Sequence, residues 1–294
     1  MVGRGRDGDV MVAVEDPTQV AQLVRTAGDL ARRQGGTVRL VTVVVKPHES
    51  PFGVFSDETI VREFAADSHE LIERAPDPEG VEVVRDLVVA RSVAKGLISA
   101  VERTEPEALV IGWDSDPTRS DALLGTTVDR VLERAPTDVY VERIGREADA
   151  VDSILLPVAG GPHTETARRG AVAVAAENDA TVTVLSVATD PLTREEAHTV
   201  ASEVAAAVTS ELGEGVETRV ESGQRVEDVI VDVASEHDVL FLGATRKGPL
   251  RGRLVGSVPR RVVSGSDETV VLARNRATAG GLLGRVIASL RSYP

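Results

Sequence analysis

The amino-acid sequence predicts an α/β protein made of two tandem doubly wound domains, each built on a five-stranded parallel sheet. Three observations predict this fold. Short runs rich in Val, Ile and Leu alternate with helical patterns along the 294 residues, the alternation runs through the chain twice, and the strands are almost continuously apolar. Strands that alternate with helices form parallel sheets with right-handed crossovers and helices on both faces. Because such strands are covered on both faces, continuous apolar runs are expected in them.

The first copy contains five predicted strands and four predicted helices. The strand patterns lie at 9–16, 37–45, 81–89, 108–112 and 138–144, and the helical patterns lie at 18–34, 57–75, 92–103 and 125–134. The first helix has apolar residues at helical spacing and stops at Gly35-Gly36. The second strand, TVRLVTVVV, is rich in β-branched residues.

The second copy repeats this order. Its strand patterns lie at 154–158, 181–187, 216–222, 239–243 and 269–275, and its helical patterns lie at 164–178, 193–212, 225–236 and 256–264. Val14 matches Val158 at an offset of 144 residues, whereas Gly112 matches Gly243 at an offset of 131. The first copy therefore carries 13 extra residues in its middle. We predict domains at 1–148 and 149–276 and a basic amphipathic tail at 277–294.

The composition limits the function classes. The net charge is −14, and only three of the 33 basic residues are lysine. An acidic surface with little lysine is typical of proteins from a very salty (halophilic) cytoplasm, and a GC-rich genome is the alternative explanation. An acidic chain argues against binding of nucleic acid. Hydrophobic residues make up 42% of the chain but aromatic residues only 2%, so the cores must consist of aliphatic side chains.

The sequence also predicts a cytoplasmic location. The absence of cysteine removes disulfides, thiolate catalysis and cysteine-based metal sites. The opening stretch MVGRGRDGDV has no apolar core of a signal peptide. No apolar run approaches the roughly 20 residues that a membrane span requires.

Two stretches with the same spacing are the strongest candidate for a site. GWDSDPTRSDALLGTT (112–127) and GATRKGPLRGRLVGSV (243–258) each begin with Gly and end in Gly followed by Thr or Ser. In a doubly wound sheet, ligands bind beyond the carboxyl ends of the strands. Gly112 and Gly243 end a strand there, and a backbone without Cβ can approach a ligand closely.

The end of each stretch is the predicted start of a helix. Gly125, Thr126 and Thr127 open one helix, and Gly256, Ser257 and Val258 open the other. A helix start offers unbonded N–H groups and the positive end of the helix dipole, so it can bind phosphate. The structural alternative is that Thr126 and Ser257 only cap their helices and that the glycines only permit close packing.

The pattern of Gly, two residues, Gly, nine residues, Gly and Ser/Thr resembles the ATP-site motif of the universal stress protein family. The resemblance covers residues 9–144 and 152–275, in the tandem form found in haloarchaea. It implies an adenine nucleotide alpha hydrolase-like, Rossmann-like fold. It further implies a cytoplasmic stress-response module that binds ATP or AMP, with or without Mg²⁺ as a cofactor.

Both copies depart from the family motif at its second Gly, which is Ser115 in one copy and Arg246 in the other. A non-Gly residue at positive φ costs about 1 kcal/mol or more. Ser115 is small enough to be tolerated. Arg246 either pairs with a phosphate or fills the space that the phosphate needs.

Other ligand positions are implied by the resemblance alone. An Asp ends the first strand in nucleotide-binding members, and Glu15, or Asp16 with a shift of one residue, takes its place in the first copy. The second copy has Ala159 and the loop AGGPHT, which could bind through backbone amides. Adenine contacts in the family come from backbone near Val43 and Val187.

Other motifs give weaker signals. GRGRDG (3–8) precedes the first strand instead of following it, so it is no dinucleotide site. The five histidines show no metal-ligand spacing, although His163 lies at the mouth of the predicted site. The Phe-bearing insert (46–59) forms a lid or a partner surface, or it packs on its own domain. The tail pattern at 280–291 docks on a membrane or a partner, or it packs back on the body.

Three functions follow from these patterns. The first is a regulatory protein that binds an adenine nucleotide. The second is a nucleotide-free interaction module that regulates a partner such as a membrane transporter. The third is a slow ATPase, which is the weakest because no residue supplies an obvious general base. The family resemblance also implies an intrachain pseudo-dimer through the last strands of the two copies and allows a further homodimer.

The variant Arg246→Gly distinguishes the two roles of Arg246. Affinity for ATP, measured by thermal shift, rises if the arginine blocks the site. It falls if the guanidinium clamps a phosphate.

Overall fold

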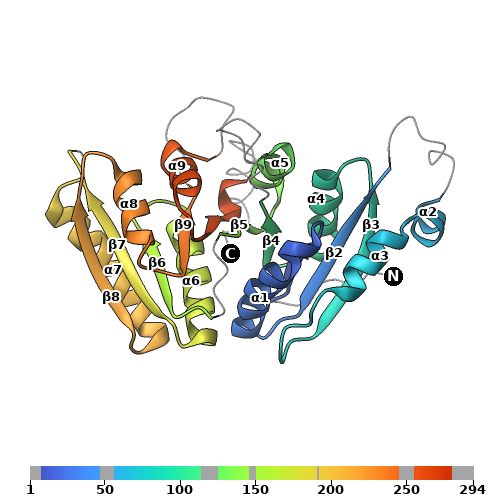
Figure 1. The fold of residues 1–294 in the computed structure, drawn as a ribbon, viewed down its shortest axis with the longest axis horizontal. Coiled ribbons are helices and arrows are strands. Elements are labelled where there is room, and N and C mark those ends of the chain that lie inside the picture. The colour runs from blue at the N-terminus through green and yellow to red at the C-terminus, as the bar shows by residue number, and fades with distance from the viewer. Residues whose placement is uncertain are drawn as a thin grey trace, which may run out of the picture. The chain divides into compact units, whose positions relative to one another are not determined.

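The computed structural model describes residues 8–46, 56–113, 125–145, 150–190, 192–244 and 255–279. These residues form two compact units (Figure 1). The first unit contains the described residues up to Gly112 and from Gly125 to Val139, and nearly all of the second unit lies between Tyr140 and Thr278. Each unit is an α/β domain with a parallel sheet.

The sheet of the first unit has the strand order β3-β2-β1-β4. These strands are β1 (Val10–Ala13), β2 (Val38–Val45), β3 (Val83–Ala90) and β4 (Ala108–Gly112), and all of their described pairings are parallel. The helices are α1 (Pro17–Gln34), α2 (Asp57–Phe64), α3 (Ala66–Arg74), α4 (Val93–Thr104) and α5 (Thr126–Arg134). Helix α1 with α2 and α3 covers one face, and α4 and α5 cover the other, as right-handed crossovers require (Figure 1).

The second unit repeats this arrangement with the order β10-β9-β6-β7-β8. Its strands are β6 (Ser153–Pro157), β7 (Thr181–Ala188), β8 (Val216–Ser222), β9 (Val239–Gly243) and β10 (Thr269–Arg274). Its helices are α6 (Thr164–Asn178), α7 (Arg194–Leu212), α8 (Val226–Ala234), α9 (Ser257–Gly265) and the short η2 (Arg276–Thr278). Helices α6 and α7 pack together on one face, and α8 and α9 pack together on the other (Figure 1).

Strand β5 (Asp138–Arg143) is divided between the two units after Val139. Its second half belongs to the second unit, where the Arg143 guanidinium donates a hydrogen bond to the Glu268 carbonyl at 2.9 Å and another to the Ser266 carbonyl. Burial is the main reason that the pKa of Arg143 is lowered, although Asp267 and Glu268 oppose this. Arg143 thus satisfies carbonyl groups just beyond the end of α9.

The ends of the helices follow local sequence signals. Asp16 caps α1 by accepting hydrogen bonds from the N–H of Thr18 at 2.9 Å and from its hydroxyl at 2.8 Å. Gly35 ends the same helix with φ of 68°, a left-handed conformation that favours glycine. Thr193 and Glu196 form a reciprocal capping box at the start of α7.

The predicted fold class is confirmed, and most element boundaries lie within two residues of the predicted ones. The single helix predicted at 57–75 is wrong, because the structure has two helices that break at Ala65. Ala65 has φ of −109° and ψ of 28°, outside the helical region, and its side chain is buried. Tertiary packing therefore sets this break, since no Gly or Pro stands there. Residues 47–55 of the Phe-bearing insert and the tail pattern at 280–291 lie outside the described residues.

Aliphatic side chains dominate both cores, as the composition predicts, with Phe241 and Tyr140 as aromatic exceptions in the second unit. Gly170, in the middle of α6, makes room for both rings. A Cβ atom on Gly170 would lie 2.7 Å from Phe241 and 2.7 Å from Tyr140. The Tyr140 hydroxyl donates a 3.0 Å hydrogen bond to the Thr166 carbonyl, which holds its ring beside the helix.

We expect Gly170→Ala to destabilise the protein. Alanine gains about 1 kcal/mol of helix propensity over glycine, but overpacking of a core costs about 1–3 kcal/mol, and both rings are held in place. A net loss of about 1 kcal/mol in the free energy of unfolding, measured by urea titration, is expected. Gly265→Ala, at the exposed end of α9, is the control: a Cβ atom there would lie 3.3 Å from a methyl group of Val231, so it should destabilise the protein less than Gly170→Ala does. Equal effects at both positions would contradict the packing role of Gly170.

Candidate functional site

In the first copy, the structure separates the roles of the two carboxylates that follow β1. Asp16 is occupied as the cap of α1. Glu15 is exposed, and its side chain makes no hydrogen bond to any described residue. Of the two positions left open by the sequence, Glu15 is therefore the carboxylate available to a ligand.

Gly112 ends β4 beside the helix that follows β1. A Cβ atom there would overlap the side-chain oxygen of Gln19 and would lie 3.2 Å from the Cδ1 atom of Leu23. The absence of a side chain at Gly112 thus has a packing cause, whatever else it permits. Gln19 was not predicted as a site residue, although it lies close to this end of β4.

The next helix of the first copy begins without a side-chain cap. Gly125 is the N-cap residue of α5, with φ of 87°, and it supplies no side-chain cap. Thr126 and Thr127 are the first two residues of the helix, so Thr126 does not cap it. A glycine at the N-cap has no side chain that could bond to the first-turn N–H groups. Asp129, in the first turn, opposes the binding of an anion.

The corresponding helix of the second copy also lacks a side-chain cap. Gly256 is the N-cap residue of α9, with φ of −63° and ψ of 170°, and Ser257 and Val258 follow it. Its first turn contains no acidic residue. The start of α9 is therefore electrostatically more favourable to phosphate than the start of α5.

The loop after β6 differs most from its counterpart. Ala159 is exposed, and Gly160 and Gly161 have φ of 73° and 119°. His163 follows and is only 4% exposed. Its Nδ1 atom accepts a 3.1 Å hydrogen bond from the N–H of Asn275, whose side-chain amide donates to the Thr166 hydroxyl at 3.0 Å.

His163 and Gln19 occupy equivalent positions at the offset of 144 residues. A Cβ atom on Gly243 would lie 3.1 Å from the Cβ atom of His163, just as one on Gly112 would meet Gln19. His163 is hydrogen-bonded to Asn275 at the end of β10. The Gln19 side chain makes no hydrogen bond to any described residue. The same place in the fold thus holds a hydrogen-bonded side chain in the second copy and, among the described residues, a side chain without such a bond in the first.

The predicted adenine positions lie beyond the end of the first strand of each copy. The ladder between β1 and β2 ends at Ala13 and Val41, so Val43 pairs only with Val88 of β3. The N–H of Val158 bonds to the Leu185 carbonyl, and Val187 lies two residues further on. Val43 and Val187 are each paired with a neighbouring strand on one side only. Their other backbone edge faces the carboxyl end of the first strand of each copy, where the adenine contact is predicted. Ser115 and Arg246 lie outside the described residues.

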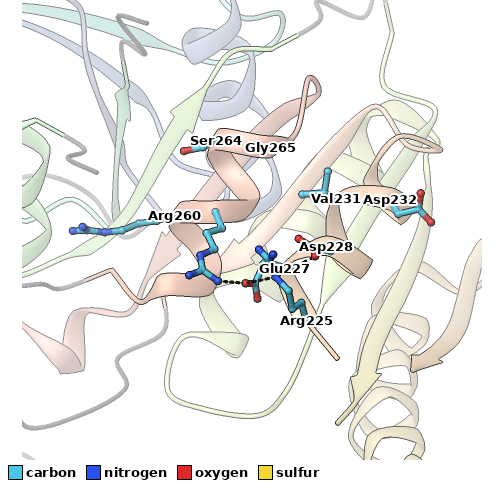
Figure 2. Close-up of a pocket in the computed structure, with 9 residues that line it drawn as sticks. Arg225, Glu227, Asp228, Val231, Asp232, Arg260, Ser264 and Gly265 are labelled. Carbon is cyan, nitrogen blue, oxygen red and sulfur yellow. Dashed lines mark hydrogen bonds and ion pairs between the residues drawn. The ribbon is translucent and has the colours of Figure 1, made fainter. Parts of the chain in front are cut away.

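A cavity of about 570 Å³ lies between α8 and α9 (Figure 2). No predicted nucleotide-site residue lines it, and its lining residues were not predicted as a site. They are Arg225, Glu227, Asp228, Val231, Asp232, Arg260, Arg261, Ser264 and Gly265. The described parts of the chain contain no group of His, Asp and Glu side chains that could hold a metal ion.

Glu227 is the buried acid of this cavity. Its carboxylate accepts from the Nε atom of Arg225 at 3.4 Å and from the Arg261 guanidinium. Burial raises the pKa of Glu227, but hydrogen bonds from its own backbone N–H and from Arg261 outweigh burial, so the pKa is lowered overall. The carboxylate is therefore charged at neutral pH.

The model of the universal stress protein family matches residues 8–143 and 150–274, most of the chain and in two copies. The chain belongs to this family. No helix among the described residues of this universal stress protein is long and apolar enough to cross a membrane.

Similar proteins agree with this assignment. A universal stress protein of Mycobacterium tuberculosis is 29% identical over 116 residues, which is 40% of this chain and 37% of the relative's own length. A universal stress protein structure from Archaeoglobus fulgidus is 17% identical, with a TM-score of 0.64 over 92% of this chain and 99% of that one. The cytoplasmic domain of a prokaryotic cation chloride cotransporter is 12% identical, with a TM-score of 0.56 over 95% of this chain and 99% of that one. At these identities, the likeness of this chain to each of the two structures shows a common fold and nothing more.

We expect Glu227→Gln to reduce the loss of stability in acid. A lowered folded-state pKa contributes stability above the unfolded pKa of about 4.3, and this contribution disappears as pH falls through the folded pKa. The variant lacks that contribution, so it should lose less stability than the wild type between pH 7 and pH 3. Urea unfolding at both pH values measures the difference. Exposed Glu73→Gln should retain the wild-type pH dependence, and identical curves for all three proteins would contradict the expectation.

Proposed function

We propose that this universal stress protein binds an adenine nucleotide, ATP or AMP, and acts as a regulatory module through conformation or partner contact. One observation carries the proposal. In both copies, a strand ends in Gly at the carboxyl edge of a parallel sheet, and the following helix begins at a Gly without a side-chain cap. Phosphate binds well at such helix starts, where N–H groups converge.

The two copies support the proposal with different groups. The first copy offers the exposed carboxylate of Glu15, which can accept hydrogen bonds from ribose hydroxyls. The second copy lacks this carboxylate but has the start of α9, whose first turn contains no acid. We propose a site in at least one copy, with domains at 1–148 and 149–276 and a cytoplasmic location.

The test is to identify nucleotide in the purified protein. The protein is prepared in high salt and denatured, and released nucleotide is identified by mass spectrometry. The stripped protein is then titrated with ATP and AMP in a thermal-shift assay. Ligand at about 1,000 times its Kd stabilises a fold by about 4 kcal/mol, a readily measured effect. If neither nucleotide nor shift is found, the proposal is wrong, and the nucleotide-free interaction module becomes the better description.

We expect Glu15→Gln to weaken nucleotide binding by about tenfold, since a hydrogen bond to a charged group contributes about 1.5–3 kcal/mol. The measurement is the Kd for AMP by calorimetry. Glu73→Gln, an exposed substitution of the same charge on α3, is the matched control and should leave the Kd unchanged. An unchanged Kd in Glu15→Gln, with binding intact, would assign the site to the second copy.

A further inference from the structure

Two arginines converge on one oxygen in the cavity between α8 and α9. The Nε atom of Arg225 lies 3.4 Å from the Oε1 atom of Glu227, and the Nη1 atom of Arg261 contacts the same oxygen. Figure 2 marks these contacts with dashed lines. Arg225 stands just before α8 and Arg261 lies in α9, so the buried carboxylate joins guanidinium groups from two elements.

The two guanidinium groups stand at the surface of the cavity. The Glu227 side chain is only 9% exposed, whereas those of Arg225 and Arg261 are 58% and 59% exposed. Each guanidinium has five N–H donors. The contacts within the described residues engage the Nε atom of Arg225 and the Nη1 atom of Arg261. The remaining donors of both groups have no partner among the described residues.

We propose that this cavity is an anion site, separate from the nucleotide site, that takes the phosphate group of a small molecule. Paired guanidinium forks match the several oxygens of a phosphate, and anchoring by a buried carboxylate reduces the entropy lost when they bind. A cavity of about 570 Å³ is larger than a phosphate ion and leaves room for the rest of such a molecule.

The charge of the lining is less unfavourable to an anion than the charge of the chain as a whole. Three arginines balance three carboxylates in the lining, while the whole chain has a net charge of −14. Asp228 is already paired with Arg225 at 3.1 Å. Asp232 is exposed, and no described residue pairs with it. Asp232 therefore weakens anion binding at long range, and its removal should strengthen it.

The experiment follows the Nε–H resonances of arginine in the ¹⁵N-labelled protein. Sodium phosphate replaces sodium chloride at constant ionic strength, and sodium acetate serves as the comparison anion. We expect saturable shifts of the Arg225 and Arg261 resonances, at lower concentrations of phosphate than of acetate. Arg225→Gln and Arg261→Gln should each weaken phosphate binding by about tenfold, and Asp232→Asn should strengthen it. Arg103→Gln, an exposed substitution of the same charge on α4, is the control and should have no effect.

The outcomes separate this site from the nucleotide site. If phosphate shifts neither arginine, or if Arg225→Gln binds phosphate as the wild type does, the proposal is wrong. It is also wrong if Ser257→Ala abolishes the phosphate response and Arg225→Gln does not, because phosphate then binds at the start of α9. Circular dichroism verifies that each variant is folded, and exposed Arg225 remains testable if Arg261→Gln fails to fold. The Kd for AMP should be unchanged in Arg225→Gln.

Discussion

The parallel direction of the strands is the constraint on which the candidate nucleotide site depends. Parallel strands end at one edge of a sheet, and each helix that follows a strand on the way back begins at that same edge. Gly112 and Gly243 end β4 and β9 there, and the uncapped starts of α5 and α9 follow. The spacing between the two glycines of each copy can therefore serve one site only because the fold returns both ends of the loop to the same edge.

The two copies share one backbone arrangement but carry different side chains at equivalent positions around the candidate site. Gln19 and His163 occupy one position, yet His163 is buried and bonded to Asn275, whereas the Gln19 side chain has no such anchor among the described residues. Glu15 corresponds to Ala159, and Asp129 in the first turn of α5 has no acidic counterpart in α9. Packing explains Gly112 and Gly243, so these two glycines alone are weak evidence of a ligand. The polar residues around them differ between the copies, so the two candidate sites are chemically unequal.

The sequence predicts local and periodic features well and tertiary ones poorly. Alternating apolar patterns predicted the order of strands and helices, because burial on both faces imposes those patterns. The break at Ala65 was missed, since packing causes it and neither Gly nor Pro marks it. Gln19 could have been found by applying the offset of 144 residues to His163. The contact between Glu227 and Arg261 spans 34 residues and joins two helices, so no local pattern could predict it.

A comparison of Arg168 with the two arginines around Glu227, all in the second unit, supports the anion site proposed at the α8–α9 cavity. Arg168 bridges Glu165 of its own helix α6 and Glu211 of α7, and its side chain is only 12% exposed. Its hydrogen bond to Glu165 is the main cause that raises its pKa. That is the geometry of a structural ion pair, with the guanidinium enclosed by its partners. Around Glu227 the arrangement is inverted, because the acid is enclosed and both guanidinium groups remain more than half exposed. Ion pairs are often no more stabilising than packed apolar side chains. Neutralising the buried carboxylate of Glu227 requires a cation partner, but it does not require that two guanidinium groups remain more than half exposed over a cavity. The proposed anion site accounts for that exposure.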